Sequence, residues 1–84
     1  MVAIDETIKI REQDYGKFEN NAVISQKLKE VAREGKTYSK LSFEKKEALD
    51  MIFHKIARLV SGEGEHKDTL HDIVGYAKLL EGLR

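Results

Sequence analysis

The fold is decided by residues 42–83, which read SFEKKEALDMIFHKIARLVSGEGEHKDTLHDIVGYAKLLEGL. Both halves of this stretch carry apolar residues at helical spacing, and a short polar turn with two glycines separates them. Ser42 is suited to cap the first helix and Gly62 to end it. Asp68 can cap the second helix, over residues 69–82. Because short turns join antiparallel helices, the stretch predicts a long helix hairpin.

The apolar residues of the hairpin form more than one stripe. In the first helix the stripe comprises Leu49, Ile52, Phe53, Ile56, Leu59 and Val60. In the second helix the stripe expected to pack on the first comprises Leu70, Ile73, Val74, Ala77 and Leu80. A second edge of that helix is also apolar, through Tyr76, Leu79 and Leu83. One hairpin and one further helix cannot cover both edges, so the pattern predicts a surface for a partner.

The first half of the chain also predicts helices. A short helix is expected over residues 5–15, with Asp5 as its N-cap and Gly16 at its end. A second helix is expected over residues 17–34, with Gly35 as its stop. The sequence therefore predicts one all-α domain over residues 1–84. It has a short N-terminal segment, one helix and then a long antiparallel helix hairpin, and it is assembled as an oligomer.

The size of the chain supports the expected assembly. A chain of 84 residues buries only about 60% of its unfolded surface, so a lone monomer is marginal. Disulfides, a metal or oligomerisation are the usual remedies. Cysteine is absent, which excludes disulfides and thiolate metal sites. We therefore expect a homo-oligomer.

Charge narrows the classes of partner. Fifteen basic and fifteen acidic residues cancel, which argues against a dedicated binder of duplex nucleic acid but allows a local basic pocket. No apolar run approaches the roughly 20 residues needed to span a membrane. The first twelve residues include acids and no apolar core of a signal peptide. A cytoplasmic protein without membrane contact is the expectation.

Two pairs of acids lie one turn apart on the predicted hairpin. Glu47 and Asp50 belong to the first helix, and Asp68 and Asp72 to the second. Carboxylates on facing helices are how helical bundles hold divalent metals, and the spacing loosely resembles that of all-α nucleoside triphosphate pyrophosphohydrolases. The other interpretation is that Asp68 caps its helix and the remaining acids are solvated or paired with bases.

Other catalytic chemistry has little support in the sequence. His54 has Asp50 and Arg58 one turn on either side, which indicates a charge network rather than a ligand set. There is no H-E-x-x-H pattern, no cysteine, and no serine in a nucleophile elbow. We expect no catalytic residue, no metal site and no cofactor.

Aromatic and basic residues suggest a site for bases and phosphates. Tyr15 and Phe18 flank a glycine at the start of the second helix, where unpaired backbone N–H groups are available. Basic residues recur on two faces, one of them next to the hairpin turn. In the alternative interpretation, the aromatic residues staple the helix end and the bases are solvated. The predicted ligand-binding residues are Arg11, Tyr15, Phe18, Asn21, Lys29, Arg33, Lys55, Arg58, His66 and Lys67.

Three segments carry a resemblance to a known group of proteins. They are REQDYGKFENNA over residues 11–22, KEALDMIFHKIARL over 46–59 and HKDTLHDIVGYA over 66–77. Together they resemble the anti-CBASS cyclic-nucleotide sponges, which are small helical proteins encoded by phages. The pattern K-D-x-x-x-D-I-x-G-Y-A in the third segment is the most distinctive part.

The resemblance implies a function and an assembly. Such sponges are compact helical hexamers that bind cyclic di- and trinucleotides in pockets between protomers, without cleaving them. In the host cytoplasm they deprive an immune effector of its signal. A cyclic dinucleotide carries two negative charges, so two or three Lys or Arg side chains per pocket suffice. The alternatives are a pyrophosphohydrolase-like enzyme and a helical interaction module without a nucleotide ligand.

Overall fold

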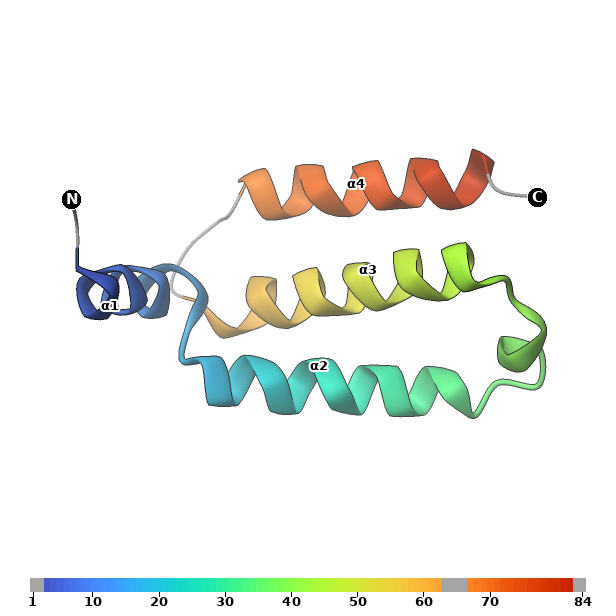
Figure 1. Cartoon of the computed structure of the whole chain (residues 1–84), viewed down its shortest axis with the longest axis horizontal. Coiled ribbons are helices and arrows are strands. Elements are labelled where there is room, and N and C mark those ends of the chain that lie inside the picture. The colour runs from blue at the N-terminus through green and yellow to red at the C-terminus, as the bar shows by residue number, and fades with distance from the viewer. Residues whose placement is uncertain (1–2, 63–66, 83–84) are drawn as a thin grey trace.

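The computed structural model of this chain describes residues 3–62 and 67–82, except for the side chains of Asp14 and Tyr15. The elements are α1 (Ile4–Tyr15), α2 (Phe18–Arg33), the short 3₁₀ helix η1 (Tyr38–Lys40), α3 (Phe43–Ser61) and α4 (Lys67–Gly82), shown in Figure 1. The predicted all-α class is thereby confirmed, with no strand in the described ranges. None of the described helices combines the length and the apolar character needed to cross a bilayer.

Two of the expected helix caps are wrong and one is confirmed. The Ser42 hydroxyl accepts a hydrogen bond from the backbone N–H of Lys45 at 3.2 Å, as predicted for the start of α3. Ala3 occupies the N-cap position of α1, and Asp5 lies inside the first turn. Asp68 likewise lies within the first turn of α4. Both carboxylates can therefore interact favourably with the dipole of their helix, but they do not occupy its N-cap position.

Gly16 forms the corner between α1 and α2. Its φ of +81° and ψ of 177° belong to a region that only glycine adopts without strain. Its N–H donates to the carbonyl of Glu12 at 2.9 Å, which ends α1 as predicted. A Cβ at this position would lie 2.5 Å from the carbonyl oxygen of Ser61, at the end of α3. The corner therefore rests directly on the backbone of α3.

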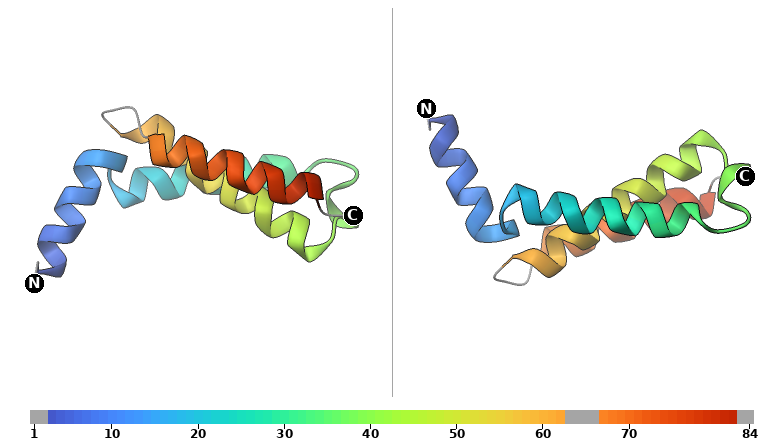
Figure 2. Two further views of the ribbon diagram at one scale, coloured as in Figure 1. Left: turned by 90° about the horizontal axis from the view of Figure 1, so that it is seen from above. Right: turned by 90° about the horizontal axis from the view of Figure 1, so that it is seen from below.

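The three long helices form one layer with α3 in the middle. α2 and α4 both lie alongside α3 and run antiparallel to it (Figure 1), while α2 and α4 form no comparable interface within the described residues. α1 leaves this layer on one side, as both views in Figure 2 show. The radius of gyration is 14.5 Å, against about 12 Å for a compact domain of this length. The layer is thus open rather than a closed bundle.

The packed face of α4 differs from the predicted stripe. Thr69 is buried, and Ile73, Tyr76 and Leu80 are half-buried, so this edge lies against α3. The predicted stripe is wrong in that Leu70, Val74 and Ala77 are exposed. Tyr76, expected on the outer edge, is part of the packed face. The small Thr69 side chain lets α4 approach α3 closely with this edge inward.

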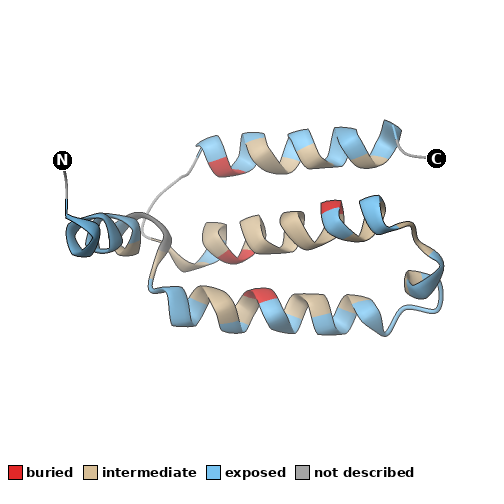
Figure 3. Cartoon of the chain, in the orientation of Figure 1, coloured by how far each residue is buried: buried red, intermediate tan, exposed pale blue. Residues whose placement is uncertain are grey.

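Every fully buried residue in the described ranges is small. These residues are Ser25, Ala48, Ala57 and Thr69 (red in Figure 3). Ala48 and Ala57 lie on opposite sides of α3, because nine residues along a helix correspond to half a turn beyond two full turns. No large side chain is fully buried among the described residues. The single protomer therefore lacks a core of interdigitated large side chains.

The Gly16 corner yields a test of stability. We expect Gly16→Ala to lower the free energy of unfolding by about 2–4 kcal/mol, through backbone strain and the clash with Ser61. Gly75→Ala is the matched control, because a Cβ there meets nothing within 4 Å. It should raise stability by about 0.5–1 kcal/mol through helix propensity. Denaturant unfolding followed by circular dichroism measures both changes. If Gly16→Ala left the free energy of unfolding unchanged, the close contact between residue 16 and the Ser61 carbonyl would be contradicted.

Candidate functional site

A hollow lies between α1, the start of α2 and the C-terminal half of α3. We call it the α1–α3 hollow. Its volume is about 530 Å³, within the range of about 300–1,000 Å³ found for small-molecule sites. It is lined by Ile8, Arg11, Glu12, Gly16, Phe18, Glu19, Asn21, His54 and Arg58. Four of the predicted ligand-binding residues, from three different helices, thus surround one cavity.

The Gly16 corner creates the hollow. It turns the chain so that Arg11 on α1 and Arg58 on α3 both border the same space. Phe18 is the first residue of α2 and is 74% exposed, so most of its ring is accessible. The Asn21 side-chain amide lies within 3.5 Å of the Gly16 carbonyl, to which its Nδ2 donates. Asn21 therefore supports the corner as well as lining the cavity.

The charges around the hollow are mixed. Arg11 and Arg58 supply two positive groups, and Glu12 and Glu19 supply two negative groups. Such a lining can hold phosphates at the guanidinium groups and can accept hydrogen bonds from base N–H groups at the carboxylates. The hollow therefore suits a ligand that carries both kinds of group.

His54 borders the hollow in a positive environment. Burial lowers the pKa of His54 below its ordinary value of 6.5, and the nearby cations Arg58, Lys29 and Lys55 lower it further. The imidazole is therefore neutral at pH 7, with one ring nitrogen as donor and the other as acceptor. Of the two residues in the predicted charge network, Arg58 acts on His54 by disfavouring the protonated imidazole, and Asp50 is not among the groups that shift its pKa.

Four other predicted ligand-binding residues, all within the described ranges, do not line the hollow. Lys29 is half-buried on α2 and close enough to His54 to affect its pKa. Arg33 is exposed at the end of α2, and Lys67 is exposed at the start of α4. Lys55 forms an ion pair with Asp72, with Nζ and Oδ2 2.9 Å apart. Of the described residues in the predicted basic site beside the hairpin turn, Arg58 lines the hollow, whereas Lys55 and Lys67 do not.

Two further predictions lie outside the described residues. They concern the side chain of Tyr15 and the whole of His66. Conversely, sequence reasoning missed Glu12, Glu19 and His54 as lining residues. The spacing of Ile8, Arg11 and Glu12 shows that these residues share one edge of a helix. It does not reveal the angle between α1 and the layer, and so it could not predict that this edge lines a cavity.

The two acid pairs do not come together. Asp72 pairs with Lys55, which marks the side of α3 that faces α4. Asp50 lies five residues before Lys55, about 140° around the helix, and so faces away from α4. In the described ranges, no three His, Asp or Glu side chains are grouped so as to hold a metal ion. The facing arrangement required for the pyrophosphohydrolase-like site is therefore absent from this part of the chain.

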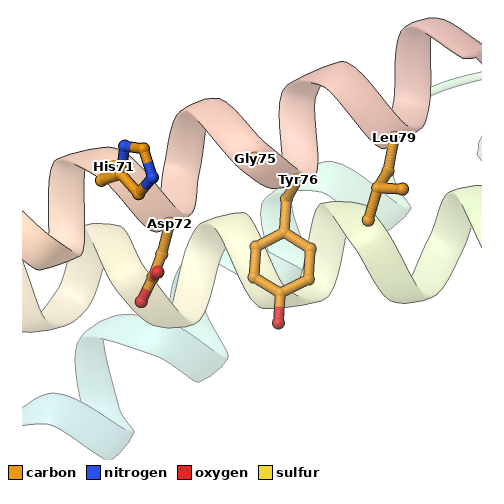
Figure 4. A pocket seen from close by; sticks show the side chains of 5 residues that line it. All are labelled: His71, Asp72, Gly75, Tyr76 and Leu79. Carbon is orange, nitrogen blue, oxygen red and sulfur yellow. The ribbon is translucent and has the colours of Figure 1, made fainter.

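A second, shallower depression lies on α4 (Figure 4). Its volume is about 410 Å³, and it is lined by His71, Asp72, Gly75, Tyr76 and Leu79. In Figure 4 the side chains of Asp72 and Tyr76 extend towards α3, whereas His71 lies to the other side. Asp72 is already engaged with Lys55, so the α1–α3 hollow is the better candidate site.

The lowered pKa of His54 predicts a pH dependence of stability. In the unfolded chain, His54 takes up its proton as the pH falls through 6.5, while in the folded protein it stays neutral to lower pH. Its contribution to stability is therefore complete above this pH and is lost as the pH falls from there towards the lowered pKa. Unfolding free energies measured across this range should fall less steeply for His54→Gln than for the wild type. Equal slopes would contradict the assigned environment.

Comparisons with known proteins place the chain in a family. No curated protein and no solved structure matches it. The model of one protein family, a domain of unknown function designated DUF6378, matches residues 1–84. The match extends over every element of the fold, including the three helices that form the walls of the hollow. The chain therefore belongs to the DUF6378 family.

Proposed function

We propose that the α1–α3 hollow binds a cyclic di- or oligonucleotide and retains it without cleaving it. The observation that carries this proposal is the convergence of Arg11, Phe18, Asn21 and Arg58 on one cavity of ligand size. An accessible aromatic ring and two guanidinium groups match the base and the phosphates of such a ligand.

In the proposed complex each group has its own role. The exposed Phe18 ring stacks on a base, because stacking needs only an accessible π-face. Arg11 on α1 and Arg58 on α3 bind the phosphates from two walls of the hollow. Glu12 and Glu19 disfavour phosphates at their own positions and accept hydrogen bonds from base N–H groups. The mixed charge thus orients the ligand instead of attracting any anion.

Binding without cleavage agrees with the chemistry of the lining. The described residues around the hollow include no hydroxyl or thiol side chain that could attack a phosphodiester. His54 is present, but its neighbours in the lining offer it no nucleophile to activate. Sequestration needs only affinity, which the lining can supply.

The resemblance to phage sponges supports the biological part of the proposal. Segment 11–22 contributes Arg11, Phe18 and Asn21 to the hollow, and segment 46–59 contributes Arg58. Two of the three segments that carry the resemblance therefore meet at the cavity. In this function the protein is a homo-oligomer, a hexamer by analogy, that removes a cyclic nucleotide signal from a host immune effector in the cytoplasm.

Phe18→Ala tests the assigned base stack. We expect the affinity for a cyclic dinucleotide to fall by about 5- to 150-fold, which corresponds to the loss of one stacked base at about 1–3 kcal/mol. Phe43→Ala is the matched control, because Phe43 is 87% exposed at the start of α3 and does not line the hollow. Isothermal titration calorimetry with adenine- and guanine-containing cyclic dinucleotides measures both variants.

The fate of the ligand separates the alternatives. Intact dinucleotide recovered after heat denaturation of the complex is expected. Magnesium-dependent loss of a nucleotide would instead favour the pyrophosphohydrolase-like enzyme, and Asp72→Asn would then abolish turnover. If no nucleotide raises the melting temperature, the helical interaction module without a ligand is the better description.

A further inference from the structure

One side of α3 is apolar along most of its length. Leu49, Phe53, Ile56 and Val60 follow one another at helical spacing, and Val60 is 63% exposed. Arg58 borders the α1–α3 hollow on the opposite side of the helix. The apolar stripe of α3 therefore faces away from α1 and from the hollow.

The flanking helices extend this stripe into a continuous surface. α2 contributes Ile24, Leu28 and Val31, and α4 contributes Leu70, Val74 and Ala77. Both helices run antiparallel to α3 (Figure 1). Successive residues rotate in the same right-handed sense around every helix, and this rotation places the apolar residues of α2 and α4 on the same side of the layer as the α3 stripe. We call this surface the apolar face; α1 projects from the other side of the layer (Figure 2).

The exposed area of the chain is too large for a monomer of its mass. A chain of 9.6 kDa is expected to expose about 5,100 Å² as a folded monomer. This chain exposes 6672 Å², an excess of about 1,600 Å² over that expectation. This excess is about twice the roughly 800 Å² that each partner buries in a stable interface of ordinary size.

We propose that the apolar face is the interface with a second copy of this chain. On this face Val31, Val60, Leu70 and Val74 are 49–66% exposed, and apolar residues are typical of the centre of a homodimer interface. In the described ranges the protomer fully buries no large side chain, so it needs a partner in order to fold stably. A second copy is present whenever the chain is synthesised, and a two-fold axis presents the same face twice.

This assignment separates the interface from the ligand site. The apolar face and the α1–α3 hollow lie on opposite sides of the layer, so each protomer presents its hollow outward from the dimer. The dimer interface does not complete the cavity, in contrast to the pockets between protomers implied by the sponge resemblance. The inference goes beyond the proposed function and does not depend on the identity of any ligand.

Charge insertion on the two flanks of α4 tests the interface. Val74 lies on the apolar face and is 53% exposed, whereas Leu79 lies on the other flank and is 61% exposed. Val74→Glu should raise the dimer dissociation constant by about 100-fold or more, because a charge would be buried without a partner. Leu79→Glu should leave it within about threefold of the wild type. On α2, Val31→Glu and Val23→Glu form a second matched pair.

Sedimentation equilibrium and native mass spectrometry measure the assembly, and circular dichroism measures the fold. A wild type that is monomeric and folded at micromolar concentration would overturn the proposal. Equal dissociation by Val74→Glu and Leu79→Glu would do the same.

Thiol labelling covers the case in which the glutamate variants fail to fold. The chain has no native cysteine, so Val74→Cys and Leu79→Cys each introduce a single thiol. In the folded protein, alkylation in Val74→Cys should slow as protein concentration rises, while alkylation in Leu79→Cys should not. Concentration-independent alkylation in both variants would overturn the proposal.

Discussion

The structure depends on the way α3 meets its two neighbours. Small residues on opposite sides of this helix, Ala48 and Ala57, are buried together with Ser25 on α2 and Thr69 on α4. Contacts through small side chains bring the helices close but bury little apolar area. With α2 and α4 on opposite sides of α3, the three helices cannot close around a common core. Both broad sides of the layer remain available, and the properties of the protein follow from what lies on each.

On one side, a backbone contact creates the candidate site. Because Gly16 has no side chain, the corner between α1 and α2 can rest on the Ser61 carbonyl. α1 then leaves the layer at an angle and forms one wall of a cavity whose other walls are α2 and α3. The cavity combines opposite charges, a neutral imidazole and an exposed ring, and the proposed binding of bases and phosphates rests on these groups. The hollow is thus a consequence of one glycine at a close approach.

On the other side, the layer presents apolar side chains from all three long helices. A domain of this size has little interior, and buried large apolar side chains are its main source of stability. Leaving these side chains exposed to water would therefore forgo much of that stability. Covering the face with a second copy would supply the missing core and leave both hollows open to solvent. Self-association and ligand binding would then use different surfaces of one small fold.

The sequence by itself determined the local features of this protein. The all-α class, the cap at Ser42 and the ends at Gly16 and Gly62 depend on interactions between residues a few positions apart, which spacing and residue type reveal. Arg11, Phe18, Asn21 and Arg58 were also predicted from their chemistry as ligand-binding residues. Only the tertiary structure decided that these four residues meet, that Lys55 pairs with Asp72 instead, and that α4 packs through Thr69 and Tyr76 while Leu70 and Val74 stay exposed. The physical reason is that the rotation of one helix against another depends on how closely small side chains let the two backbones approach. When a helix has more than one apolar edge, apolar periodicity does not reveal which edge allows the closest approach.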